Sequence, residues 1–421
     1  MDANRFTDQK LGRLTPTTTG RGADVAFVPD PLPLDWTLPA KTWPLLVNAR
    51  EAIARLDGVG RHMPSPEILL RPLQRREAIR SSSLEGTYAT PEELLLFEIE
   101  PREPGSRNDP ANAWKEVFNY ANALTLGQQL LKEELPLSLR LIRRLHERLM
   151  EGVRGNDSTP GEFRRVQVQI GADARFVPPP PQEVMPGLDA FEKYLHTDTK
   201  IDPLVRCFMV HYQFEAIHPF TDGNGRVGRL LLALMTCEWL GLNRPWLYLS
   251  PYFERYKDDY IDKLFRVSTH GDWSGWVDFC LAATIDQATD AMARIDKLIA
   301  LKEKYQQTLR EFSGAQSARL FQIIDQLFSA PAVTAPQLQK LYAVTYPTAR
   351  ADIENLVGAK ILTAANTPKR PRIYYAPEII EIAHSEPTGV MGAPAVTDAP
   401  ASTVRDQARN LDDVRPLVDQ G

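Results

Sequence analysis

The chain has 421 residues, more than one ordinary domain, and predicts two or three. Its hydrophobic content of 43% and charged content of 24% are typical of a soluble globular protein, and a net charge of −5 argues against a whole-protein polyanion binder. Charges or prolines interrupt the long apolar runs, so we expect no membrane span. Three cysteines in apolar surroundings and an N-terminus without a signal-peptide core indicate a cytoplasmic protein with reduced thiols.

The N-terminal residues 1–30 have no apolar period and are expected to form a flexible lead. From Trp43 onward, apolar residues recur every three to four positions, the pattern of amphipathic helices. The period predicts a nearly all-helical body, which we divide into an N-terminal region at 31–110 and a core at 111–312. The helices are expected at 43–56, 66–83, 91–97, 111–134, 138–151, 184–195, 202–215, 224–240, 256–269 and 273–310.

One stretch of this region has strand character. Val166, Val168 and Ile170 alternate with polar residues, and a glycine-containing turn precedes a short apolar return segment at 175–177. The predicted fold class is therefore all-α with one β-hairpin at 165–177.

A separate unit is predicted at 317–383. Its apolar pattern favours helices near 320–327, 336–341 and 346–357, followed by strands at 361–363 and 372–375. Three helices before a basic hairpin are typical of a winged helix-turn-helix domain. The remaining residues, 385–421, are rich in Pro, Ala, Thr and Asp and are expected to be a disordered tail.

A glycine-rich turn joins two of the predicted helices. Pro219 cannot continue the first helix, and Gly223-Asn224-Gly225 permits a tight turn where the second helix begins. A helix start has unpaired N–H groups, and glycine has no Cβ to block their approach. This turn therefore predicts an anion site.

Charged residues surround the same turn. Arg226 and Arg229 fall on one face of the new helix, where each guanidinium can hold a phosphate oxygen. Asp222 is a hard oxygen ligand suited to magnesium (Mg²⁺), and His218 titrates near neutrality and can take a proton from a hydroxyl. Taken singly, these residues have structural explanations as a turn, a packing histidine and solvated charges. Their combination in one short window predicts a phosphate-binding site with a metal ligand and a base beside it.

The pattern His218-Pro-Phe-x-Asp222-Gly-Asn-Gly-Arg226-x-x-Arg229 resembles the motif of Fic/DOC family protein adenylyltransferases. The resemblance implies transfer of AMP from ATP to a Ser, Thr or Tyr hydroxyl of a target protein or of the chain itself, with His218 as general base and Asp222 as Mg²⁺ ligand. It also implies that the 165–177 hairpin is a flap that receives the target segment. The nucleotide-binding residues it implies are Gly223, Asn224, Gly225, Arg226, Val227, Gly228 and Arg229, with Tyr260 as a contact to the nucleotide ring.

A second match lies upstream. Ser81, three residues, then Glu85 and Gly86 resemble the family's inhibitory-helix motif. Residues four apart share a helix face, and glycine can end the helix close to another backbone. The resemblance implies that Glu85 pairs with Arg229 and inhibits transfer.

Other functions remain open at this point. Removal of AMP by a water that Glu85 activates would use the same scaffold. A nucleotide-sensing regulator could bind DNA through 317–383, using Thr348, Arg350 and the wing residues Lys369, Arg370 and Arg372. The same unit could instead be a docking module or support a homodimer.

Overall fold

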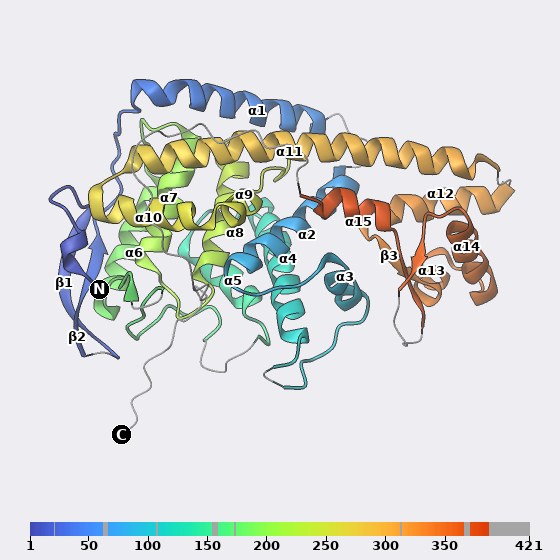
Figure 1. Cartoon of the computed structure of the whole chain (residues 1–421), viewed down its shortest axis with the longest axis horizontal. Coiled ribbons are helices and arrows are strands. Elements are labelled where there is room, and N and C mark those ends of the chain that lie inside the picture. The colour runs from blue at the N-terminus through green and yellow to red at the C-terminus, as the bar shows by residue number, and fades with distance from the viewer. Residues whose placement is uncertain are drawn as a thin grey trace, which may run out of the picture.

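In the computed structural model, the described residues are 1–20, 22–61, 66–106, 108–153, 159–171, 174–311, 314–365 and 371–386. The chain is mostly helical up to residue 311, as predicted (Figure 1). Among the described residues, no helix has the length and apolar character needed to cross a membrane. The helices of this region are α1 (Trp43–Arg61), α2 (Pro66–Leu84), α3 (Pro91–Ile99), α4 (Ala111–Lys132), α5 (Leu139–Leu149), α6 (Pro181–His196), α7 (Pro203–Ile217), α8 (Asn224–Trp239), α9 (Ser250–Arg255), α10 (Lys257–His270) and α11 (Trp273–Thr308). The short α9 is the one that the sequence pattern did not predict.

Helix α8 lies at the centre of the molecule, with α7, α4 and α2 packed around it (Figure 1). Its side chains are buried on nearly every side, as the continuous apolar run from Leu230 to Met235 requires. The long α11 and the outer α1 lie alongside one another over this centre. Each fully buried leucine contributes about 1.5–3 kcal/mol relative to exposure, so α8 is a firmly held platform for the residues at its start.

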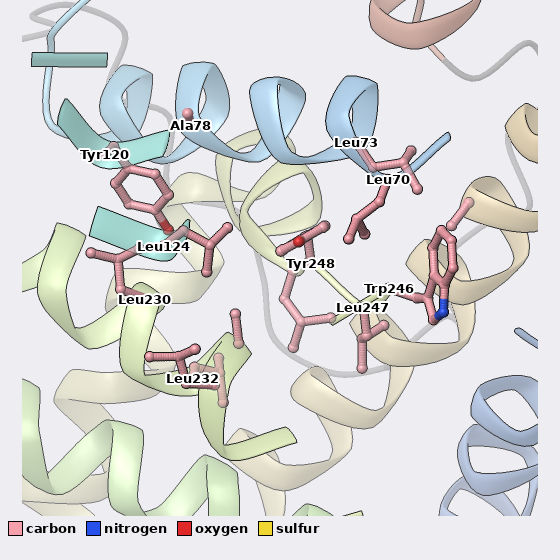
Figure 2. Close-up of a cluster of buried hydrophobic side chains, with 14 of the residues drawn as sticks. Leu70, Leu73, Ala78, Tyr120, Leu124, Leu230, Leu232, Trp246, Leu247 and Tyr248 are labelled. Carbon is pink, nitrogen blue, oxygen red and sulfur yellow. The ribbon is translucent and has the colours of Figure 1, made fainter. Parts of the chain in front are cut away.

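Helix α2 packs into the same core. Figure 2 shows Leu70, Leu73 and Ala78 of α2 facing an apolar cluster. That cluster includes Tyr120 and Leu124 of α4, Leu230 and Leu232 of α8, and Trp246, Leu247 and Tyr248 between α8 and α9. The two helices that carry the motif residues, α2 and α8, therefore belong to one packed unit.

The N-terminal residues form an ordered hairpin, so the expectation of a flexible lead at 1–30 is wrong. Strands β1 (Gly12–Thr19) and β2 (Gly22–Pro29) pair antiparallel, with Gly12 opposite Pro29. Phe27 of β2 is fully buried beside Phe176 and Phe265, and its N–H donates to the Val177 carbonyl oxygen at 2.9 Å. These partners are far away in the sequence, which is why the local pattern did not predict the hairpin.

The predicted hairpin at 165–177 is reduced to a single antiparallel pair, so the two strands expected there are corrected. Ile170 and Phe176 exchange N–H···O bonds of 2.8 and 3.2 Å. Side chains take up neighbouring carbonyl oxygens that a longer ladder would use: Arg164 donates to Val166 at 2.9 Å and Gln167 to Val168 at 2.9 Å. Within its described residues, this flap is a loop pinned by side chains.

The C-terminal unit keeps the predicted order of three helices and two strands, with two further elements. It consists of α12 (Gly314–Ser329), β3 (Ala332–Thr334), α13 (Ala335–Tyr342), α14 (Tyr346–Gly358), β4 (Thr363–Ala364), β5 (Ile373–Tyr375) and α15 (Pro377–His384). The small antiparallel sheet has the order β3-β5-β4, and β3 and α15 were not predicted. Helix α15 packs against α2 and α11 (Figure 1). Lys369 and Arg370 of the predicted wing, and the tail beyond Glu386, lie outside the described residues.

Candidate functional site

The loop between α7 and α8 has a fixed backbone. His218 ends α7 in the left-handed conformation, with φ of 51°, and its N–H donates to Phe214 at 2.9 Å. Gly223 precedes α8 with φ of 75°, a conformation that glycine adopts without strain. The Asn224 side chain closes the loop by accepting from the Phe220 N–H at 2.8 Å and donating to the Phe220 carbonyl at 2.9 Å. These contacts fix the loop so that the first turn of α8 lines the cavity described below.

Two buried residues support this loop from behind. The Arg164 guanidinium donates to the carbonyl oxygens of His218 at 2.7 Å and Pro179 at 2.6 Å. The His146 ring stacks on Phe220 with centroids 3.7 Å apart. Because Gly161 N–H donates to His146 Nδ1 at 2.8 Å, Nε2 carries the proton and donates to the Asp222 carbonyl at 3.1 Å. These contacts fix the positions of His218 and Asp222.

The hydrogen bonds of His218 leave one ring nitrogen available as a base. Its Nδ1 lies 3.4 Å from the Glu215 carbonyl oxygen, which can only accept, so Nδ1 carries the proton. Nε2 is then the acceptor nitrogen, and His218 lines the cavity. Burial lowers the pKa of His218 to about 4, and the Arg164 charge acts in the same direction. The imidazole is therefore neutral near pH 7.

This low pKa predicts the pH dependence of any reaction in which His218 acts as base. A base must be unprotonated, and its protonated fraction rises only as the pH falls towards its pKa. With a pKa of about 4, the rate should hold from pH 7 down to about pH 5, whereas an ordinary histidine would already lose activity near pH 6.5. The initial rate measured between pH 4.5 and 8 checks this. An acid limb centred near 6.5 would contradict it.

The cavity has a polar end and an apolar end. At the polar end lie His218, Asp222 and the start of α8. The apolar end lies between the flap and α10, where Phe176 faces Phe265 at a ring-centroid distance of 6.4 Å. Further lining residues are Ile170, Tyr212, Ile261, Leu264 and Ser268. A ligand with a charged phosphate at one end and a flat apolar ring at the other would fit these two ends of the cavity.

The predicted nucleotide-binding residues divide into two groups. Gly223, Asn224, Gly225, Arg229 and Tyr260 line the cavity. Arg226, Val227 and Gly228 are not among the lining residues. The Arg226 guanidinium is buried behind the loop, where it pairs with Glu116 at 3.0 Å and Asp222 at 3.3 Å. In this structure, Arg226 therefore supports the loop.

Tyr260 has its hydroxyl engaged inside the protein. His211 Nδ1 lies 3.1 Å from the Gly228 carbonyl and must donate to it, so Nε2 accepts from the Tyr260 hydroxyl at 2.9 Å. The Tyr260 ring stacks on Phe253 with centroids 4.6 Å apart. A direct contact from Tyr260 to a nucleotide ring remains a prediction.

Sequence reasoning missed Glu215, which also lines the cavity. Its Oε1 is buried and has no hydrogen-bond partner among the described residues. Burial raises the pKa of Glu215 to about 8, against the opposing effect of the Arg229 charge. A Cβ on Gly228 would lie 2.2 Å from this oxygen, so the glycine makes room for the carboxyl group. The three-residue spacing from His218, one helical turn, is the signal that could have identified it.

The predicted pairing of Glu85 with Arg229 is present in the structure. Arg229 Nη2 lies 2.5 Å from Glu85 Oε1, and the same guanidinium donates to Ser81 Oγ and to the Ser81 carbonyl, both at 2.8 Å. The Glu85 carboxylate also lies over Gly225, where an added Cβ would be 2.0 Å from Oε1. A carboxylate of α2's end therefore occupies the space beside the N-terminus of α8.

Protein-family models match the two segments of the chain that carry Ser81 to Glu85 and His218 to Arg229. Residues 43–129 match the model for the Fic/DOC family N-terminal region, and residues 136–236 match the model for the Fic/DOC family. The first range contains Ser81 and Glu85, and the second contains His218 to Arg229. Two Fic/DOC family models therefore match separate parts of the chain, 43–129 and 136–236, and the chain is distantly homologous to protein adenylyltransferases.

Individual relatives support the same assignment. The protein adenylyltransferase Fic of Drosophila grimshawi is 36% identical over 178 residues, which cover 41% of this chain and 34% of that protein. The Drosophila erecta protein is 27% identical over 221 residues, covering 50% of this chain and 42% of its own length. The chain thus spans less than half of these relatives. A crystal structure of a Fic family protein from Desulfovibrio desulfuricans, 22% identical, covers 82% of this chain and 98% of that chain with a TM-score of 0.53, which shows a shared fold.

Proposed function

We propose that this chain is a protein adenylyltransferase that transfers AMP from ATP to a Ser, Thr or Tyr hydroxyl of a target protein or of itself. The observation that carries the proposal is the hydrogen-bonded state of His218. Its Nδ1 proton is committed to the Glu215 carbonyl, so Nε2 is a neutral acceptor in the same cavity as the N-terminus of α8. A proton acceptor beside an anion site is the combination that transfer of a phosphate group to a hydroxyl requires.

The reaction follows from this arrangement. The hydroxyl oxygen of the target attacks the α-phosphorus of ATP in line with the departing pyrophosphate. His218 Nε2 accepts the hydroxyl proton as the new P–O bond forms, and the bond to the β-phosphate oxygen breaks. Backbone N–H groups of Asn224 and Gly225, in the first turn of α8, stabilise the charge on the phosphate oxygens. The products are an AMP ester of the target and pyrophosphate.

Asp222 fits a role as ligand of Mg²⁺. Its Oδ1 accepts from the Gly223 N–H at 2.5 Å and from Arg226 at 3.3 Å, while its side chain keeps 39% of its surface exposed at the cavity. No group of three or more metal-ligating side chains occurs among the described residues. Asp222 would therefore hold Mg²⁺ together with phosphate oxygens of the nucleotide, where the ion neutralises phosphate charge.

Arg229 and Glu85 provide the proposed regulation of this activity. Arg229, one turn into α8, binds the γ-phosphate of ATP held in the productive pose. Glu85 competes for that guanidinium and places a negative charge beside the triphosphate. ATP then binds with its α-phosphate away from the line of attack, and transfer is slow until Glu85 moves.

Labelled ATP distinguishes this function from phosphoryl transfer. The protein incubated with Mg²⁺ and ATP should incorporate label from the α-phosphate and none from the γ-phosphate. Mass spectrometry should find AMP on a hydroxyl side chain of the chain itself or of an added lysate protein. Incorporation from the γ-phosphate would show a kinase and overturn the proposal.

A further inference from the structure

Helix α2 is fastened on sides that do not face the nucleotide cavity. Arg75 donates to the Ser329 carbonyl at the end of α12, at 2.7 Å, and forms a two-pronged pair with Glu98. Arg80 pairs with Glu254 at 3.1 Å and also with Glu386, the last described residue. Neither arginine lines the cavity. The helix that precedes Glu85 is thus attached to segments that follow the Fic region by many residues.

A buried chain of charges connects α2 to the end of α15. Asp290 of α11 forms ion pairs with Arg76 of α2 at 3.0 Å and with Arg294 at 2.8 Å. Arg294 in turn donates to the carbonyl oxygens of Ile382 at 2.5 Å and Ser385 at 2.7 Å. The last carbonyls of a helix lack partners within the helix, so Arg294 caps α15.

The charged residues that link α2 to α15 are buried, so they have little freedom to move. Arg76 and Arg294 are each only 4% exposed, and a buried guanidinium is stable only while its partners stay in place. Ile379, Ile380 and Ala383 of α15 are buried. Burial lowers the pKa of the neighbouring His384 to about 3, with the arginines acting in the same direction, so His384 adds no positive charge to the cluster.

The C-terminal part of α2 contacts both the end of the C-terminal unit and Arg229 of α8. Arg80 contacts Glu386, and the next residue, Ser81, binds Arg229 through its hydroxyl and its carbonyl. Ser83 Oγ donates to Glu254, the other partner of Arg80, at 2.9 Å. Glu85 follows one turn after Arg80. A shift of α2 that breaks one set of contacts therefore displaces the other.

We propose that the C-terminal clamp, defined as α15 with Ser385 and Glu386, holds α2 in the position from which Glu85 pairs with Arg229. This inference rests on the proposed adenylyltransferase function and adds a regulator to it. The C-terminal unit sets the fraction of molecules in which Arg229 is blocked, so an event that loosens α15 raises AMP transfer without any contact to the nucleotide.

Two full-length variants loosen the clamp in different ways. Arg294→Gln removes the cap of α15, and Ile379→Ala removes buried packing. We expect each to increase the initial rate of α-label incorporation about threefold to tenfold, the effect of roughly 0.7–1.4 kcal/mol. Amide hydrogen exchange in residues 77–85 should accelerate in the same variants. Lys340→Gln, at an exposed residue of α13 inside the C-terminal unit, is the matched control and should change neither quantity.

The Glu85→Gly background shows whether the effect passes through Glu85. There, the clamp variants should give no further increase, because Arg229 is already free. If the clamp variants raised the rate of α-label incorporation equally in that background, the proposal would be overturned. It would also be overturned if the clamp variants were folded but showed the wild-type rate and the wild-type amide hydrogen exchange in residues 77–85. Absence of α-label incorporation by Glu85→Gly itself would refute the proposed activity, and exchange in residues 77–85 would then decide alone whether the clamp holds α2.

Discussion

Replacing His218 with alanine should lower the rate of AMP transfer by about 10² to 10⁴-fold, the usual contribution of a general base. ATP affinity should change little, because the proposed contacts to phosphate come from the start of α8 and from Arg229. The rate is measured by α-label incorporation in the Glu85→Gly background, and affinity by equilibrium binding of ATP to the same protein.

Two further variants separate the chemistry from the fold. His218 has φ of 51°, a conformation that costs alanine about 1 kcal/mol but that asparagine adopts more readily. His218→Asn should therefore be equally inactive with a melting temperature closer to wild type. His196→Ala, at an exposed histidine, should keep full activity. A His218→Ala protein that retains more than a tenth of the rate would contradict the assignment of the base.

Glu85→Gly should raise AMP transfer at least about tenfold. The Glu85–Arg229 pair is largely buried, with the two side chains 14% and 3% exposed, so it is little screened by solvent. A bias of about 1.4 kcal/mol against the productive pose already corresponds to a tenfold loss of rate. Glu85 lies just beyond the end of α2, so glycine there does not interrupt the helix. Initial rates at saturating ATP measure the effect.

A structural role for the pair predicts the opposite sign. If the pair only stabilised the fold, Glu85→Gly would lower the melting temperature and the rate together. Glu85→Gln, which keeps the size and removes the charge, should give an intermediate rate. The double variant Glu85→Gly with Arg229→Ala should stay inactive, since Arg229 is then needed for the γ-phosphate. A folded Glu85→Gly protein that binds ATP and is no faster than wild type would exclude inhibition by Glu85.

The sequence predicted the helices and the central loop because their signals are local. The apolar run from Leu230 to Met235 contains no glycine or proline and favours a buried helix, and Pro219 with Gly223 encodes the turn directly. The Glu85–Arg229 contact was also predicted, although here the signal was a resemblance and the distance in sequence is large.

The features that were missed depend on partners far along the chain. The β1–β2 hairpin is held by Phe27 against Phe176 and Phe265. Strand β1 is rich in threonine and gives little local hydrophobic signal, and β2 has only a short apolar stretch. Arg226 was expected at the phosphates, but its buried partner Glu116 lies on α4. Glu215 sits on an apolar helix, where its spacing from His218 alone did not mark it as part of the site.

The side-chain bridge from Asn224 to Phe220 has a consequence for nucleotide affinity. Both hydrogen bonds join atoms of the loop itself, so the shape of the turn does not depend on a phosphate. A flexible glycine-rich turn would lose conformational entropy on binding, about 1–2 kcal/mol for each residue that becomes ordered. In this loop the conformational entropy is already lost when the protein folds, so the site is preorganised for binding. Gly223 and Gly225 can therefore lie in a binding loop without making it flexible, because the hydrogen bonds of Asn224 between them hold the backbone in place.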